Sequence, residues 1–499
     1  HAFKKYRVGF KGSFLILTTL FFSTSIILWY QSRPSYTPTR VAIFPFINDS
    51  YKSQKVTWDG LAIAEMVQSL LAAEQDKVLA YPVDWILAAA NLDSLRFSDY
   101  RTSFSRKIKA DFALWGTFEQ IDKTYIIKVT FYDFASGNFK QKSETVQDVY
   151  HLIEFAGRVS ERILADLCRE EHTFVNTVEF CCDEQVELHF KAKVAQLYNE
   201  KEEAFRLAEA AVAVDSSATV CLNFLAELIL QQAEGIDKRG GDAFPHFKKA
   251  KELLLRVNAE NPQNYTSLRF LGQLYLANEK WNEAQSSLLE SHTLNPHQAE
   301  LLYSVTRLNA KRYSIFGFES EEDLLQQAIY MNPAFFAAYL SLADYYHLKN
   351  RNDRALKAVR DVLNINPSNV DGLMALAKIY LAKKDWVNCL ETYEKVMELD
   401  SENADVFYNI GIVYYYDNDF TNAIKYFEHA VALKDHLDSR LYLAYIYEKL
   451  GDTTKAISYL RERIQKRQSE DDRFAEEARK HLFQIMTERG VIDSLSNSH

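Results

Sequence analysis

The chain of 499 residues is 47% hydrophobic and 25% charged, which is ordinary for globular proteins and gives room for roughly two to four domains. A net charge of −10 without a stripe rich in Lys and Arg argues against nucleic acid as a partner. Only 15 glycines and 9 prolines leave few turns, so a helix-rich fold is expected.

The amino-terminal segment predicts a membrane anchor. Residues 1–13 are basic and include Lys11, and an uncharged apolar run follows over 14–30. This run approaches the roughly 20 residues that a helix needs to cross a bilayer. Trp29 and Tyr30 end it, where aromatic rings favour the membrane interface. The positive charge before the run predicts a cytoplasmic amino terminus and an exported remainder, whereas a cleaved signal peptide is the alternative.

Residues 31–38 contain Pro34, Pro38 and several hydroxyl side chains, which predicts a short extended linker. Alternating and continuous apolar runs then predict a small α/β domain over 39–170. Its expected elements are a strand at 41–48, a helix at 58–73, a strand at 78–81, helices at 84–90 and 100–109, a hairpin of 125–133 with 139–146, and a helix at 149–167.

Short motifs in this domain are those of one known family. They are Val41-Ala-Ile-Phe-Pro-Phe46, Ala110-Asp111, Gly116-Thr117 and Asp133-x-x-Ser-Gly137. With them the domain resembles the amino-terminal domain of TolB and its relatives in bacterial envelope proteins. The resemblance implies an envelope protein that binds other proteins and is not catalytic. No stretch resembles the propeller blades that follow this domain in TolB.

One pattern then recurs at a period of 34 residues, which is typical of a stacked array of small helical units. Residues in register are Tyr339, Leu373 and Phe407, then Tyr346, Tyr380 and Tyr414, then Ala355, Cys389 and Ala423. These blocks resemble the tetratricopeptide repeat, a helix–turn–helix unit. The family's pattern is matched most fully by Leu268, Leu271, Gly272, Tyr275, Ala284, Leu288 and Pro296. We expect about eight repeats over 184–470, then a capping helix and tail over 471–499.

The resemblance also implies a binding groove. In tetratricopeptide proteins the second, fifth, ninth and twelfth residues of the first helix line a concave groove that holds extended peptides. Those positions, with two residues that border them, are here Asp344, His347, Asp371, Lys378, Tyr408, Asn409, Tyr415, Tyr442 and Tyr445. Tyrosine combines rigid apolar area with a hydrogen-bonding end, which suits protein recognition. The alternative is that these tyrosines pack against the next repeat.

Catalytic and metal-binding patterns are absent from the sequence. It has no phosphate-binding Gly-rich loop, no Gly-x-Ser-x-Gly elbow and no His-Glu-x-x-His helix. The five cysteines lack metal-ligand spacing, although Cys181 and Cys182 are adjacent. We therefore expect no enzyme, no cofactor and no metal.

The expected fold class is α+β multi-domain: one transmembrane helix, a small TolB-like α/β domain, and an all-α superhelix of tetratricopeptide repeats. The expected protein is a single-pass inner-membrane scaffold with periplasmic domains, which assembles an envelope complex through protein–protein contacts. Its partners would be other proteins and the membrane, not nucleic acid. One alternative is a protein that self-assembles into filaments or rings. Another is an envelope protein that senses a ligand.

Overall fold

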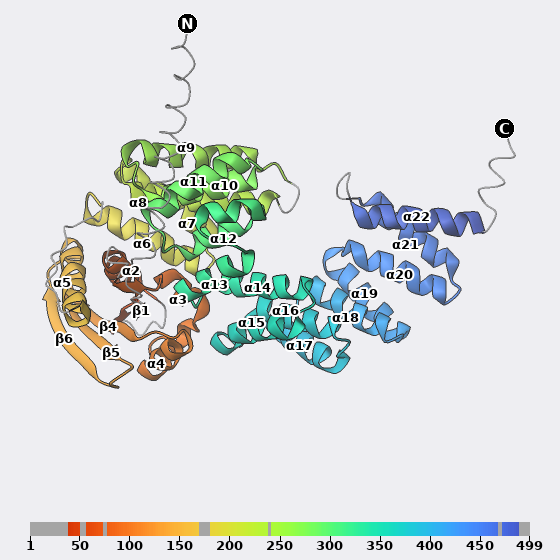
Figure 1. The fold of residues 1–499 in the computed structure, drawn as a ribbon, viewed down its shortest axis with the longest axis horizontal. Helices are drawn as coiled ribbons and strands as arrows, with labels where there is room; N and C mark the ends of the chain where they lie inside the picture. Colours follow the sequence, from red (N-terminus) through yellow and green to blue (C-terminus); the bar gives the residue numbers. More distant parts are fainter. Residues whose placement is uncertain are drawn as a thin grey trace, which may run out of the picture.

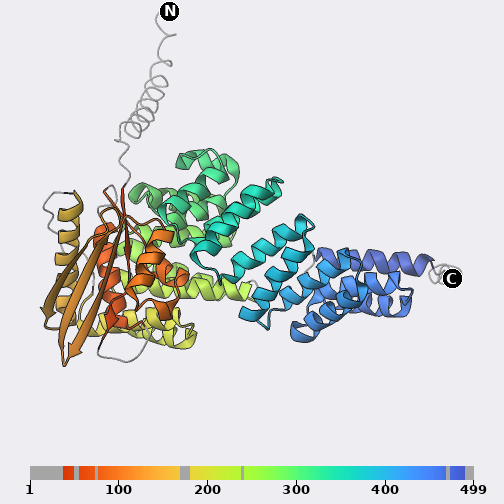
Figure 2. The same ribbon diagram turned by 90° about the horizontal axis from the view of Figure 1, so that it is seen from below.

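The computed structural model describes residues 38–49, 56–72, 77–168, 180–237, 241–467 and 472–488. Within them an α/β domain lies at one end of a superhelix of paired helices, and the later pairs extend away from the domain (Figure 1). A view turned by 90° shows the same extension (Figure 2).

The α/β domain is built on a mixed sheet. Its strands are β1 (Thr39–Ile43), β2 (Ile47–Asn48), β3 (Val78–Ala80), β4 (Phe112–Ile121), β5 (Thr124–Asp133) and β6 (Phe139–Val146). The strand order is β3-β1-β4-β5-β6, and β2 pairs with β4. β1 is parallel to β3 and β4, whereas β4, β5 and β6 form an antiparallel meander. Val41, Ala42 and Ile43 of β1 are fully buried, as expected for a central parallel strand.

Helices cover both faces of this sheet. They are α2 (Trp58–Ala72), α3 (Val83–Ala89), the 3₁₀ turn η1 (Leu92–Ser94), α4 (Ser98–Lys107) and α5 (Val149–Cys168). Neighbouring residues of β4 point to opposite faces. Trp115 lies beneath Arg101 of α4, while Leu114 shares a cavity wall with Phe155 of α5. The strands and helices expected here are present, except that the strand expected at 41–48 is divided into β1 and β2, and β4 is a further long strand.

The rest of the described chain is a series of helix pairs. The pairs are α6 (Asp183–Leu197) with α7 (Lys201–Val214), α8 (Thr219–Asp237) with α9 (Phe244–Glu260), α10 (Tyr265–Ala277) with α11 (Trp281–Leu294), α12 (Ala299–Thr306) with α13 (Glu321–Met331), α14 (Phe336–Leu348) with α15 (Asn352–Ile365), α16 (Val370–Ala382) with α17 (Trp386–Leu399), α18 (Ala404–Tyr416) with α19 (Phe420–Lys434), and α20 (Leu437–Lys449) with α21 (Thr453–Gln465). The 3₁₀ turn η2 (Ala310–Phe316) separates α12 from α13, and α22 (Arg473–Glu488) follows the last pair. First helices of consecutive pairs contact one another, as α14 contacts α16, so they line the inner side of the superhelix.

One backbone device recurs in the turns inside these pairs. Asn350, Lys384 and Asn418 adopt left-handed φ angles of 56°, 58° and 64° at the same place in successive units. Such a residue ends one helix and lets the chain reverse direction. The pairs therefore repeat in backbone conformation as well as in sequence.

Small residues let the two helices of a pair approach closely. A Cβ atom added to Gly411 of α18 would lie 2.7 Å from the ring of Phe427 in α19. At Gly272 of α10 it would lie 2.5 Å from Leu288 of α11. The absence of a side chain at these positions is what allows the large residue opposite to fill the space.

The α/β domain packs against the first repeats. Glu65 of α2 forms an ion pair with Lys193 of α6. The hydroxyl of Tyr198 accepts a hydrogen bond from the backbone N–H of Val56 at 2.9 Å. Trp85 of α3 meets Phe335, beside α14, with ring centroids 4.4 Å apart. These contacts join the domain to the start and the middle of the superhelix, and one hydrophobic core runs through both.

The fold class and the inner-membrane localisation need correction. None of the helices in the described residues is both long enough and apolar enough to cross a bilayer. The expected span over 14–30, with Lys11, Trp29 and Tyr30, lies outside those residues. The prediction of a transmembrane helix as part of the fold is therefore wrong, and so is the single-pass localisation that depends on it. That prediction depended on the apolar run, the basic residues before it and the aromatic residues at its end.

Candidate protein-binding site

Four of the predicted groove residues form a cluster on α18 and α20, which we call the tyrosine surface: Tyr408, Tyr415, Tyr442 and Tyr445. Tyr442 is its centre, with ring centroids 5.8 Å from Tyr408, 5.3 Å from Tyr415 and 6.0 Å from Tyr445. All three contacts are edge-to-face, which aromatic rings favour. Each of the four side chains is partly exposed.

The tyrosine surface also holds consecutive repeats together. Tyr442 stacks on Phe427 at 5.4 Å, and Tyr408 stacks on His436 at 4.5 Å. The Tyr445 hydroxyl donates a 2.7 Å hydrogen bond to Glu477 of α22. These tyrosines thus both pack between repeats and present an edge to the inner side.

The tyrosine surface has one positive charge beside it, that of a lysine, and its phenol groups are neutral. Lys449 lies 4.7 Å from the ring centroid of Tyr415, close enough for a cation–π interaction. Burial raises the pKa of Tyr442 to about 12, and burial raises those of Tyr408 and Tyr445 as well. Their hydroxyls therefore stay protonated near neutral pH and can donate as well as accept hydrogen bonds.

The other predicted residues lie on α14, α16 and α18. Lys378 donates a hydrogen bond to Asp344 at 2.8 Å, and His347 shares one with Asn352 at 3.0 Å. Asp371 is exposed and Asn409 is half-buried. The structure thus places these residues along successive inner helices, with Asp344 and Lys378 in direct contact.

Two stretches of the chain match models of the tetratricopeptide repeat, at residues 336–369 and 408–471. The second stretch contains the whole tyrosine surface. The chain contains tetratricopeptide repeats. This repeat fold is a binding fold and is typically not catalytic, and proteins built from it typically bind other proteins. The family matches do not support the TolB-like assignment of the α/β domain.

Solved structures similar to parts of this chain include two of IFIT1 and one of MamA. A monomeric mutant of IFIT1 with Gppp-AAAA is 13% identical, covers 70% of this chain and 82% of its own, and has a TM-score of 0.45. Human IFIT1 as a dimer with PPP-AAAA is 15% identical over 64% and 84%, with a TM-score of 0.41. MamA is 15% identical over 31% and 91%, with a TM-score of 0.27. Among curated proteins none matches.

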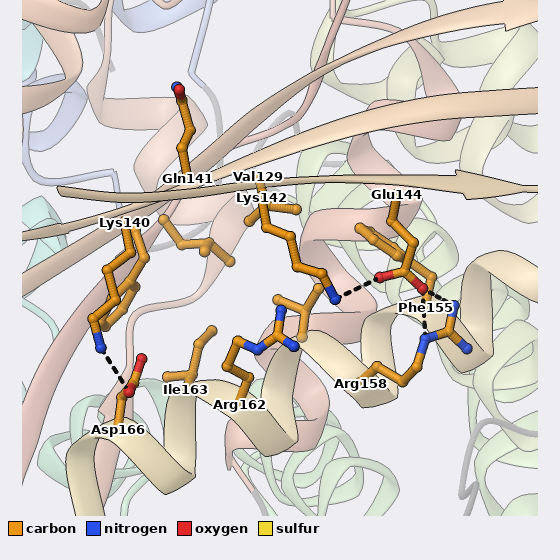
Figure 3. Close-up of a pocket in the computed structure, with 13 residues that line it drawn as sticks. Val129, Lys140, Gln141, Lys142, Glu144, Phe155, Arg158, Arg162, Ile163 and Asp166 are labelled. Carbon is orange, nitrogen blue, oxygen red and sulfur yellow. Dashed lines mark hydrogen bonds and ion pairs between the residues drawn. The ribbon is translucent and has the colours of Figure 1, made fainter.

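A hollow lies in the α/β domain, between the hairpin β5–β6 and α5 (Figure 3). Its volume is about 290 Å³ and its floor is apolar, with Val129, Phe155 and Ile163. Figure 3 shows that the charged side chains of β6 point toward α5, while Gln141 points away. Lys140 pairs with Asp166 at 2.7 Å, so charged side chains at the rim already have partners within the protein. This hollow contains none of the predicted site residues.

Sequence reasoning missed a group of charged residues between α2 and the first repeats. They are Glu65, Lys193, Glu227 and Arg269. The sequence could have indicated two of them by their positions in the repeat: Arg269 is the fifth residue of α10 and Glu227 the ninth of α8. These are the groove-lining positions that were applied only to later repeats. Among the described residues no group of three His, Cys, Asp or Glu side chains could hold a metal ion.

Proposed function

We propose that the protein is a scaffold that binds another protein along the inner side of α14, α16, α18 and α20. The observation that supports this most directly is the tyrosine surface, where Tyr408, Tyr415, Tyr442 and Tyr445 meet with their edges exposed. Aromatic clusters with hydrogen-bonding ends are characteristic of binding hot spots. The exposed pair of Asp344 and Lys378 continues the same inner side toward the amino terminus.

The inner side has one part in contact with the α/β domain and one part beyond it, and this supports the same proposal. The first repeats contact the α/β domain through the Glu65–Lys193 pair, whereas α16 to α22 extend beyond it (Figure 1). A partner would therefore find the carboxy-terminal part of the groove accessible. The finer prediction, assembly of a bacterial envelope complex, has no separate support in the fold, so the proposal is limited to scaffolding.

Affinity capture from the native cell with the full chain tests the proposal. We expect other proteins to co-purify with the wild-type chain and to be lost with Tyr415→Ala. Tyr415 is only half-buried, so its exposed part is available to a partner. Lys395→Glu on the outer helix α17 is the control, and it should retain the same chains. Particle size is measured in parallel. A large assembly of this chain alone, unchanged by Tyr415→Ala, would contradict the scaffold and favour self-assembly.

A further inference from the structure

Two adjoining cavities lie between α2 of the α/β domain and the inner helices of the first repeats. The first, of about 280 Å³, is bounded by α2, α6, α8 and α10. The second, of about 300 Å³, is bounded by α2, α3, α10 and the start of α12. Glu65, Lys193 and Arg269 line both. The Glu65–Lys193 ion pair therefore borders both cavities.

This ion pair is only partly satisfied. The Glu65 and Lys193 side chains are 15% and 20% exposed, and Oε1 of Glu65 has no hydrogen-bond partner among the described residues. Burial raises the pKa of Glu65. Desolvation alone would lower the pKa of Lys193, but the carboxylates of Glu65 and Asp84 raise it overall. A buried carboxylate oxygen thus faces the cavities with free accepting capacity.

Arg269 and Glu227 face the first cavity from neighbouring inner helices. They attract each other electrostatically, yet no salt bridge joins them, and within the described chain Arg269 pairs with no carboxylate. Arg269 instead lies over the ring of Phe270, 4.4 Å from its centroid. A cation without a carboxylate partner among the described residues and an anion that accepts a hydrogen bond from Gln231 at 3.2 Å therefore line one small space.

Deeply buried polar atoms point to the same space. Asn223 is 7% exposed, and its Oδ1 has no partner, although its Nδ2 donates to Asn264 at 3.1 Å. His189 is 3% exposed, and its Nδ1 also lacks a partner. Both residues line the first cavity. Buried polar groups are nearly always hydrogen-bonded to protein or to water, so this cluster has unused hydrogen-bonding capacity for a water molecule or a bound polar group.

The remaining wall of the first cavity is aromatic. Phe180, Phe224 and Phe270 line it, and the last two are 5% and 6% exposed. An occupant would thus meet both charged groups and aromatic rings, with Arg269 lying over the ring of Phe270. The volume of about 280 Å³ lies near the lower end of small-molecule sites, which begin at about 300 Å³.

We propose that the first cavity binds a free α-amino acid with an apolar side chain. Its carboxylate pairs with the guanidinium of Arg269, a geometry that arginine favours. Its ammonium group donates to the carboxylate of Glu227 and to Oδ1 of Asn223. The side chain lies against Phe224 and Phe270. This arrangement gives partners to Arg269 and to Oδ1 of Asn223, and a second partner to Glu227.

Such a ligand would contact α8 and α10 of the repeats and face Glu65 of α2. It would therefore stabilise the contact between the α/β domain and the superhelix, as ligands stabilise the states that bind them. The inference matches the ligand-sensing alternative that the sequence allows. It does not depend on the scaffold function, because the tyrosine surface lies on other helices.

Three probes with one side chain and different head groups test the proposal on the full chain. L-phenylalanine has both charges, phenethylamine only the ammonium, and 3-phenylpropionate only the carboxylate. Calorimetry and thermal unfolding should show binding of L-phenylalanine, with binding at least tenfold weaker for either half-probe. L-leucine should also bind. Equal binding of 3-phenylpropionate, or no binding of either amino acid, would overturn the proposal.

Variants locate the site. Arg269→Gln and Glu227→Gln should each weaken L-phenylalanine binding at least tenfold, while Arg206→Gln on the outer helix α7 should leave it unchanged. Circular dichroism checks that each variant is folded, and Arg269→Lys provides a conservative version if Arg269→Gln is not. Unchanged binding in the folded variants would contradict the assignment to this cavity. Scaffolding is measured separately, because partner capture by Tyr415→Ala involves no residue of this site.

Discussion

Lys378 of α16 and Asp344 of α14 occupy equivalent positions of consecutive repeats and are joined by a 2.8 Å hydrogen bond. Their side chains are 57% and 58% exposed. An exposed pair of this kind contributes only about 0–1 kcal/mol to folding. The two residues are therefore available for recognition at little structural cost.

Reversal of one charge in this pair should separate binding from folding. We expect Lys378→Glu to leave the thermal unfolding midpoint nearly unchanged but to lower partner capture severalfold, because it replaces an ion pair by two neighbouring acidic side chains, at 378 and 344. Quantitative capture with the wild-type chain and with Lys395→Glu measures the effect. If Lys378→Glu captures the partner as well as the wild-type chain does, this pair is not part of the proposed binding surface.

Two glycine substitutions should change stability in opposite directions. Gly411→Ala brings a methyl group 2.7 Å from the Phe427 ring, and such overpacking costs about 1–3 kcal/mol. Gly157→Ala in α5 meets nothing within 4 Å and should stabilise by about 0.5–1 kcal/mol through helix propensity. Urea unfolding followed by circular dichroism compares the two. A neutral Gly411→Ala would mean that α18 and α19 can separate without cost.

Arg463 should be essential for the attachment of α22. Its side chain is 2% exposed, and it pairs with Asp472 at 2.7 Å and with Asp438 at 3.2 Å. Replacement by Met removes the cation beside the buried carboxylate of Asp472, whose side chain is 6% exposed, and this costs about 3–5 kcal/mol. We expect hydrogen exchange in α22 to accelerate, while exchange in the α/β domain stays unchanged. Lys466→Met is the control, because its partner Asp435 is exposed and the loss should be about 0–1 kcal/mol.

His189 should make the fold sensitive to acid. Burial lowers its pKa to about 3, from an ordinary value of 6.5. The unfolded chain therefore takes up a proton below pH 6.5 while the folded chain does not. Stability is fully present above pH 6.5 and falls by about 1.4 kcal/mol for each pH unit between 6.5 and 3. His189→Leu should reduce the slope of the unfolding midpoint against pH in this range, and an unchanged slope would assign it to other groups.

The sequence predicted what local patterns determine. Tyr339, Leu373 and Phe407 recur at one spacing because each first helix has to bury the same face, so the repeats follow from periodicity alone. The hairpin of β5 and β6 also followed from alternation and a turn. Such features depend on residues that are close in the chain.

Contacts between distant parts could not be predicted in the same way. Glu65 and Lys193 are 128 residues apart and lie on two separate helices. Charged residues on helices usually face solvent, so nothing local indicates that these two are buried against each other. For the tyrosine surface the sequence allowed both packing and binding. The structure shows Tyr442 stacked on Phe427 and partly exposed, and its role in binding stays a prediction.

Contact between the α/β domain and the first repeats also constrains how this chain can evolve. Glu65 meets α6, and Trp85 meets Phe335 beside α14, so the distance between these two anchor points is fixed by the size of one domain. Duplication or loss of a repeat between them would pull one anchor away from its partner. Repeats beyond α15 carry no such constraint. Changes in copy number are therefore expected toward the carboxy terminus, where homologues should differ in length.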